Sequence, residues 1–100
     1  MQEILERIKY LSEEQLKNPK ESVYTIVAHL LEELGEFSTA ICIEDGSDVK
    51  GYKKLDESST EEAMDVLICV LSMYYARGGK TEDIATYVEK KLDKWESKIK

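Results

Sequence analysis

The chain has little of what builds tight turns and short strands. Its 100 residues include one proline and five glycines. Gly and Pro are the residues that most strongly mark turns and loops, so their scarcity argues against a fold rich in strands and turns. The apolar residues instead recur three and four positions apart, which is the spacing of helix faces. We therefore predict an all-α protein.

Histidine is scarce and paired cysteines are lacking, and this limits the chemistry available. Cys42 and Cys69 each lie inside an apolar run, and no Cys-x-x-Cys or Cys/His spacing indicates zinc or a redox pair. We expect both to be buried, reduced thiols. The single histidine, His29, does not follow a glutamate by three residues, which excludes a ferritin-like di-iron site. A glycine-rich phosphate loop, a serine nucleophile motif and a dinucleotide fingerprint are missing too.

Positive charge is scarce as well. With 14 basic against 21 acidic side chains, the net charge is -7. Proteins that follow a nucleic-acid backbone neutralise its phosphates with Lys and Arg, so we expect no nucleic-acid partner. A small phosphate compound presented through a bound cation remains compatible with this charge.

Long apolar runs are absent from the first residues. The stretch MQEILERIKYL alternates charged and apolar side chains, unlike a signal peptide or a membrane-spanning segment. We expect a cytoplasmic protein without a membrane partner.

What is present is the pattern of one helical domain over residues 1–100. A chain of this length buries only about two thirds of the surface that its unfolded form exposes, so a partner subunit would help. The spacing predicts a four-helix, bundle-like fold with helices over residues 2–17, 19–44, 59–77 and 81 to nearly the C-terminus.

Helix start signals support these boundaries. Asn18 before Pro19 is typical of a helix N-terminus, Ser59 with Glu62 forms the pattern of a capping box, and Thr81 is a candidate cap for the last helix. The last helix carries an apolar series that we expect on its inner side: Ile84, Val88, Leu92, Trp95 and Ile99.

The longest predicted connection, residues 45–58, is polar and shows no periodicity. Long loops in small domains are often functional. Tyr52 in this loop could stack on a base, although a plainly solvated loop is the simpler interpretation.

The third predicted helix carries the most informative pattern. From Ala63 to Ala76 it is apolar or aromatic except for Asp65 and Ser72. A carboxylate among such residues is costly unless it is paired, hydrogen-bonded or coordinated to a cation. Glu62 lies one turn earlier on the same face.

The second predicted helix repeats this arrangement with Glu33 and Glu36. If the two helices pack antiparallel, Glu33, Glu36, Glu62 and Asp65 converge, and no basic residue lies within either pair's turn. Carboxylates alone are ligands for a hard divalent cation, so we predict a site for Mg²⁺, with Mn²⁺ as an alternative. The plainer interpretation is that the glutamates are solvated and that Glu62 serves its cap.

These motifs resemble a known family. EELGEF followed by EEAMDVLICVLSMYYARGG is similar to the E-x-x-E and E-x-x-D motifs of the MazG-like, all-α nucleoside triphosphate pyrophosphohydrolases, over about residues 23–94. The superfamily also includes dimeric dUTPases and phosphoribosyl-ATP pyrophosphohydrolases. The resemblance implies a Mg²⁺-dependent hydrolase that cleaves a nucleoside triphosphate to the monophosphate and pyrophosphate, with Glu33, Glu36, Glu62 and Asp65 as metal ligands and catalytic groups. It also implies a homodimer or homotetramer.

Many relatives carry a Lys and, four residues later, an Asn in the last helix. Here that region reads EKKLDKWESK, with Lys94 near the position where the Asn would fall. The resemblance makes Lys91 and Lys94 candidates for binding substrate phosphates, whereas each taken alone is typical of a solvated residue.

Two other functions stay open at this point. The chain could be a non-catalytic helical module that assembles through its third helix, or an enzyme that hydrolyses phosphoribosyl-ATP. His29, four residues before Glu33, could bond a ligand carboxylate, but a partly buried structural histidine is the plainer interpretation.

Overall fold

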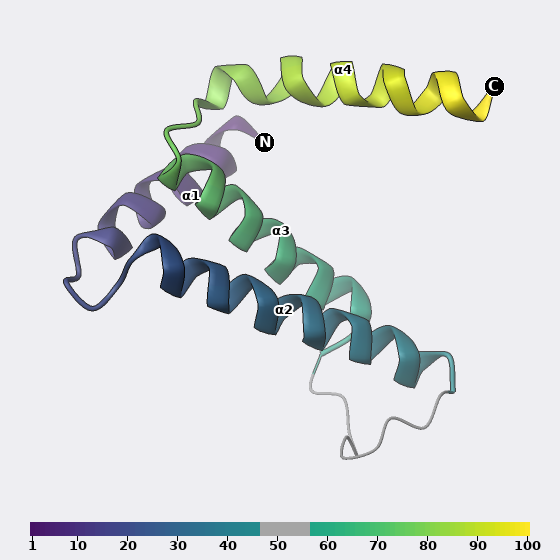
Figure 1. Ribbon diagram of the computed structural model, residues 1–100, viewed down its shortest axis with the longest axis horizontal. Coiled ribbons are helices and arrows are strands. Elements are labelled where there is room, and N and C mark those ends of the chain that lie inside the picture. Colours follow the sequence, from purple (N-terminus) through teal and green to yellow (C-terminus); the bar gives the residue numbers. More distant parts are fainter. Residues whose placement is uncertain (47–56) are drawn as a thin grey trace.

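The computed structural model describes residues 1–46 and 57–100. These two ranges contain four helices and no strand, which confirms the all-α prediction. Along the chain the helices are α1 (Gln2–Leu16), α2 (Val23–Glu44), α3 (Ser59–Ala76) and α4 (Thr81–Ile99) (Figure 1). None of these helices is both long and apolar enough to cross a membrane.

The centre of the fold is the antiparallel pair α2 and α3, with α1 packed on α3 (Figure 1). Ile26 and Ala40 of α2 and Tyr75 of α3 are the buried apolar residues of the described chain. Ser12 of α1 is buried too, and its hydroxyl donates to the Ser72 carbonyl at 3.0 Å. This buried core is small for three packed helices.

The start of α2 differs from the sequence prediction. Ser22 is the N-cap, and its side chain accepts from the Thr25 amide while the Thr25 hydroxyl accepts from the Ser22 amide. Asn18 instead caps a turn, where its side chain accepts from the Lys20 amide at 3.0 Å. The prediction of a helix start at Pro19 was therefore wrong, because Thr25 with Ser22 satisfies the free amides of the helix.

The N-cap of α3 lies one residue earlier than predicted. The capping box is formed by Ser58 and Glu61, not by Ser59 and Glu62. Ser59 is then free to donate from its amide to Glu44 at the end of α2, at 2.8 Å. This hydrogen bond ties the two helices together where the chain leaves one and enters the other. It also means that Glu62 has no capping role.

The last helix departs most from expectation. Its N-cap is Lys80, without a side-chain cap, and Thr81 bonds the Tyr75 hydroxyl instead. α4 runs away from the α2–α3 pair and packs chiefly on the first part of α1 (Figure 1). Consequently, four of the five apolar residues expected on its inner side are exposed in the single chain, namely Val88, Leu92, Trp95 and Ile99, whereas Ile84 is half-buried.

Most of the predicted loop over residues 45–58, including Tyr52, lies outside the described residues.

Candidate metal centre

The antiparallel packing of α2 and α3 brings three of the predicted carboxylates together. Glu33 of α2 and Glu62 and Asp65 of α3 each offer an oxygen, and these oxygens all lie within 4.8 Å of one another. We call this group the acidic cluster. Two helices are needed to form it, because residues three apart on one helix share only a side of that helix.

Two oxygens of the acidic cluster are buried without a hydrogen-bond partner among the described residues. They are Oε2 of Glu33 and Oε2 of Glu62. Glu62 as a residue is 9 % exposed. A buried carboxylate oxygen without a partner is destabilising, so it calls for a proton or a cation.

The environment raises the pKa of both glutamates. Burial is the main reason that the pKa of Glu33 lies above its ordinary value, and the charges of Glu36 and Asp65 add to the shift. Burial likewise raises the pKa of Glu62, with further contributions from Glu36 and Glu57. Both effects disfavour the ionised form unless a positive charge is supplied.

Glu36, the fourth predicted ligand, is exposed and stands outside the acidic cluster. Its charge nevertheless is the second cause of the raised pKa at both Glu33 and Glu62. The charge of Glu36 therefore acts on Glu33 and Glu62 from the solvent-exposed side of the acidic cluster.

A fifth carboxylate, Glu57, was missed by the sequence analysis. The charge of Asp65 is the main reason that the pKa of Glu57 lies above its ordinary value. Glu57 precedes α3 by two residues and has no helical spacing to Asp65, so only the return of the chain from α2 places it there. The one sequence feature that could have indicated Glu57 is its position directly before the capping box of α3.

No side-chain cation compensates the cluster within the described parts of the chain. The ion pairs found there lie on outer surfaces and join Lys9 with Glu13, Lys17 with Glu14, His29 with Glu32, and Lys100 with Glu96. A set of carboxylate oxygens with unpaired buried members is the donor set that Mg²⁺ or Mn²⁺ accepts. The residues present therefore fit a hard divalent cation.

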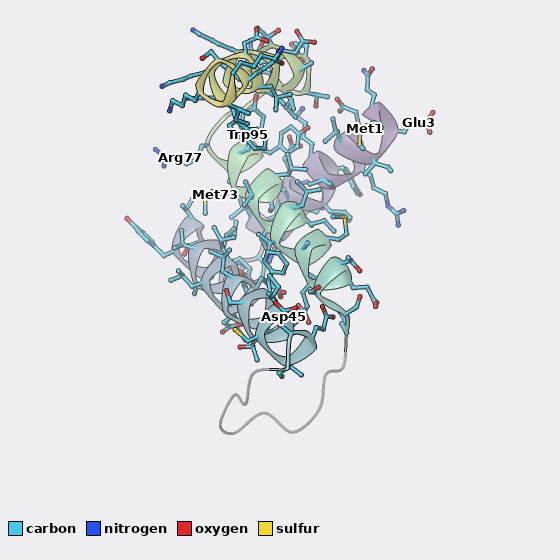
Figure 2. The ribbon with its side chains drawn as sticks, turned by 90° about the vertical axis from the view of Figure 1, so that its right-hand side faces the viewer. Met1, Glu3, Asp45, Met73, Arg77 and Trp95 are labelled. Carbon is cyan, nitrogen blue, oxygen red and sulfur yellow. The ribbon has the colours of Figure 1, made fainter. Side chains whose placement is uncertain are left out.

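Lys91 and Lys94 are not brought to the cluster within one chain. Both are exposed on α4, which packs chiefly on α1. Figure 2 shows α4, which carries Trp95, above the α2–α3 pair, with Asp45 at the far end of α2.

A cavity of about 230 Å³ adjoins the acidic cluster, with Glu33 in its wall. It lies among α1, α2 and α3 and combines apolar with polar side chains. Its other lining residues are Gln15, Ile26, His29, Ile68, Cys69 and Ser72.

His29 and the cysteines differ from their predicted environments. His29 is exposed and lies 3.8 Å from Glu32, so it is not a partly buried structural residue. Cys42 is exposed, whereas Cys69 is half-buried. Burial, with the charges of Glu33 and Asp65, raises the pKa of the Cys69 thiol, which favours its unreactive form.

Comparison with known proteins adds no relative: no family model, curated protein or solved structure matches the chain. The chemistry of the acidic cluster therefore carries the functional proposal.

Proposed function

We propose that the protein is a Mg²⁺-dependent nucleoside triphosphate pyrophosphohydrolase that yields a nucleoside monophosphate and pyrophosphate. In this proposal it acts in the cytoplasm as a homodimer or homotetramer, and Mn²⁺ can replace Mg²⁺. The observation that carries the proposal is the acidic cluster with its two unpaired buried oxygens. The sequence resemblance supplies the reaction class.

Glu33, Glu62 and Asp65 would hold the cation, with Glu36 beside them on the solvent side. A bound divalent cation neutralises and orients the phosphates and lowers the pKa of a bound water. The rigid α2–α3 pair contributes positioning, because both helices are tied at their shared end by the Ser59–Glu44 hydrogen bond.

Glu36 and Glu57 lie outside the three-residue cluster but close to it. A carboxylate that is not fully used as a ligand is free to accept a proton from the attacking water. These two residues are therefore our candidates for the general base.

The cavity beside Glu33 is suited to the nucleoside part of the substrate. Ile26 and Ile68 offer apolar surface for the flat faces of a base, and the Gln15 amide offers both a donor and an acceptor for its edge. Because the same cavity includes Glu33, a nucleoside bound there would direct its phosphates toward the acidic cluster.

The test is pyrophosphate release from a panel of canonical and modified nucleoside triphosphates and phosphoribosyl-ATP, with Mg²⁺ and after its removal by a chelator. We expect release from at least one nucleoside triphosphate that stops on chelation and returns on adding Mg²⁺. Turnover of phosphoribosyl-ATP alone would identify the related enzyme instead. The absence of release from every compound, with no stabilisation by Mg²⁺, would favour the non-catalytic module.

A further inference from the structure

The hydroxyls of Ser12 and Ser72 form a hydrogen-bonded pair between α1 and α3. The Ser12 hydroxyl donates to the Ser72 carbonyl at 3.0 Å, and the oxygens of the two hydroxyls lie 3.1 Å apart. Ser12 is 3 % exposed, whereas Ser72 is half-buried and lies in the wall of the cavity beside Glu33. The pair therefore joins a buried position on α1 to a position on α3 that a ligand in the cavity can reach.

The chemistry of the partners fixes the direction of these two hydrogen bonds. A carbonyl oxygen accepts and never donates, so the single hydroxyl proton of Ser12 is committed to the Ser72 carbonyl. The hydrogen bond between the two hydroxyls must then use the proton of Ser72. Within the described parts of the chain, no other group donates to the Ser72 hydroxyl oxygen. Ser72 consequently offers the cavity lone pairs and no proton.

The remaining polar groups of the cavity wall add to this preference or adapt to it. Glu33 in its ionised form also accepts only, and Gln15 offers both a donor and an acceptor. Gln15 follows Ser12 by three residues and so lies on the same side of α1. A ligand that presents an N–H group to Ser72 gains a hydrogen bond. A ligand that presents a carbonyl oxygen there sets lone pairs against lone pairs and leaves both groups unsatisfied.

We propose that Ser72 selects nucleotides whose base carries an amino group, and that Ser12 is the positioning residue that sets this preference through the direction of the Ser72 hydroxyl. Cytosine and adenine carry an exocyclic amine where uracil and hypoxanthine carry a carbonyl oxygen, so the first member of each pair is the favoured base. The inference rests on the proposed function, because it names the class of base that the nucleoside cavity accepts.

The first test measures the affinity of free nucleosides for the full chain without Mg²⁺, by ligand-observed NMR. Nucleosides carry no phosphate, so their binding depends on the cavity and not on a cation or on turnover. We expect cytidine to bind about 10-fold more tightly than uridine, and adenosine more tightly than inosine, because an unsatisfied buried polar group costs about that much. Equal affinities within each pair, or no binding of any of the four, would overturn the proposal.

Two substitutions separate the roles of the two serines. Ser12→Ala releases the proton of the Ser72 hydroxyl, which can then turn toward the ligand and donate. We expect this variant to bind cytidine more weakly and uridine more tightly than the natural chain does. Ser72→Ala removes the acceptor, so cytidine should bind about 10-fold more weakly while uridine does not weaken. Loss of packing alone weakens both nucleosides together, and that result in Ser12→Ala would contradict its role as a positioning residue.

Ser97→Ala is the matched control. The Ser97 hydroxyl also donates to a backbone carbonyl, that of Lys94 at 2.7 Å, but it lies on exposed α4. This variant should keep the preference of the natural chain, and the same change of preference in it would speak against a specific role for Ser12. If Ser12→Ala loses its helical circular dichroism, Ser72→Ala decides the matter, because unchanged cytidine binding there would refute the selection by Ser72.

Turnover separates this inference from the proposed function. With Mg²⁺, kcat/KM should be higher for CTP than for UTP in the natural chain, and Ser12→Ala should narrow or reverse that ratio. Hydrolysis of both triphosphates with equal kcat/KM would overturn the base preference and support the hydrolase. Selection between cytidine and uridine without hydrolysis of any triphosphate would support the base preference and overturn the hydrolase.

Discussion

The α2–α3 pair and α4 are both helical, but the pair buries acidic side chains whereas α4 exposes apolar ones. The pair places carboxylates where apolar residues are expected, so charge is confined among packed helices. α4 places apolar residues where charge is expected, so Val88, Leu92, Trp95 and Ile99 meet solvent in the single chain. In the proposed function a cation compensates the charge of the pair. The exposed apolar residues of α4 have no such counterpart in the single chain.

We expect the largest effect, on turnover, from removing one negative charge of the acidic cluster. Asp65→Asn keeps the size of the side chain but removes a charge, and turnover should fall by more than about 100-fold, since even residues behind metal ligands are commonly worth 10- to 100-fold. Pyrophosphate release measures this. Asp93→Asn, on exposed α4, is the control and should retain full activity. A fully active Asp65→Asn enzyme with unchanged helix content would show that Asp65 is not a ligand.

Cation binding should stabilise the pair. At a Mg²⁺ concentration 100 times its Kd the gain is about 2.7 kcal/mol, which in a domain of this size raises the melting temperature by on the order of 10 °C or more. Thermal unfolding followed by circular dichroism measures it. Asp65→Asn should lose most of the increase, whereas Trp95→Asp should keep it. An equal increase in both variants would place the cation elsewhere.

The next largest effect is expected on stability, when a buried alanine of α2 and an exposed alanine of α4 are each enlarged to leucine. Ala40 is 1 % exposed on α2, so Ala40→Leu should destabilise the fold by about 1 to 3 kcal/mol through overpacking. Ala85→Leu, at an exposed position on α4, should change the stability by no more than about 0.5 kcal/mol. Urea unfolding of both variants measures the difference, and equal losses would contradict the burial of Ala40 between packed helices.

The smallest expected effect is on the pH dependence of the metal-free protein. The folded pKa values of Glu33 and Glu62 lie above the ordinary value of 4.5, so the folded state holds more protons than the unfolded state just above that pH. Stability from these two groups therefore falls as pH rises above about 4.5. Urea midpoints across pH should show this slope weakened in Glu33→Gln. With Mg²⁺ the slope should reverse, because binding requires deprotonated ligands.

The sequence pattern was sufficient for the helices and for the pairing of carboxylates on α2 and α3. Apolar spacing identified the four helices of the described residues. The start of α2 was placed too early, and the N-caps of α3 and α4 were assigned to the wrong residues. Caps are exchanged among neighbouring Ser, Thr and Glu residues at little cost, so spacing alone does not select one of them. The approach of Glu57 to Asp65 has no periodic signal and was missed.

By itself, the sequence determined that this chain is helical, which residues share a helix face, and that two of those faces carry acidic pairs, because helical periodicity is a local property of the backbone. Only the tertiary structure decided that three of the acidic residues meet, that Glu36 stays at the solvent side, and that α4 departs from the pair. Those outcomes depend on the antiparallel packing of α2 with α3 and on the hydrogen bonds before α4, in which the Tyr74 hydroxyl donates to the Lys80 carbonyl and the Tyr75 hydroxyl bonds the Thr81 hydroxyl. Contacts between distant residues are set by how helices dock, and docking is not encoded in the period of any one helix.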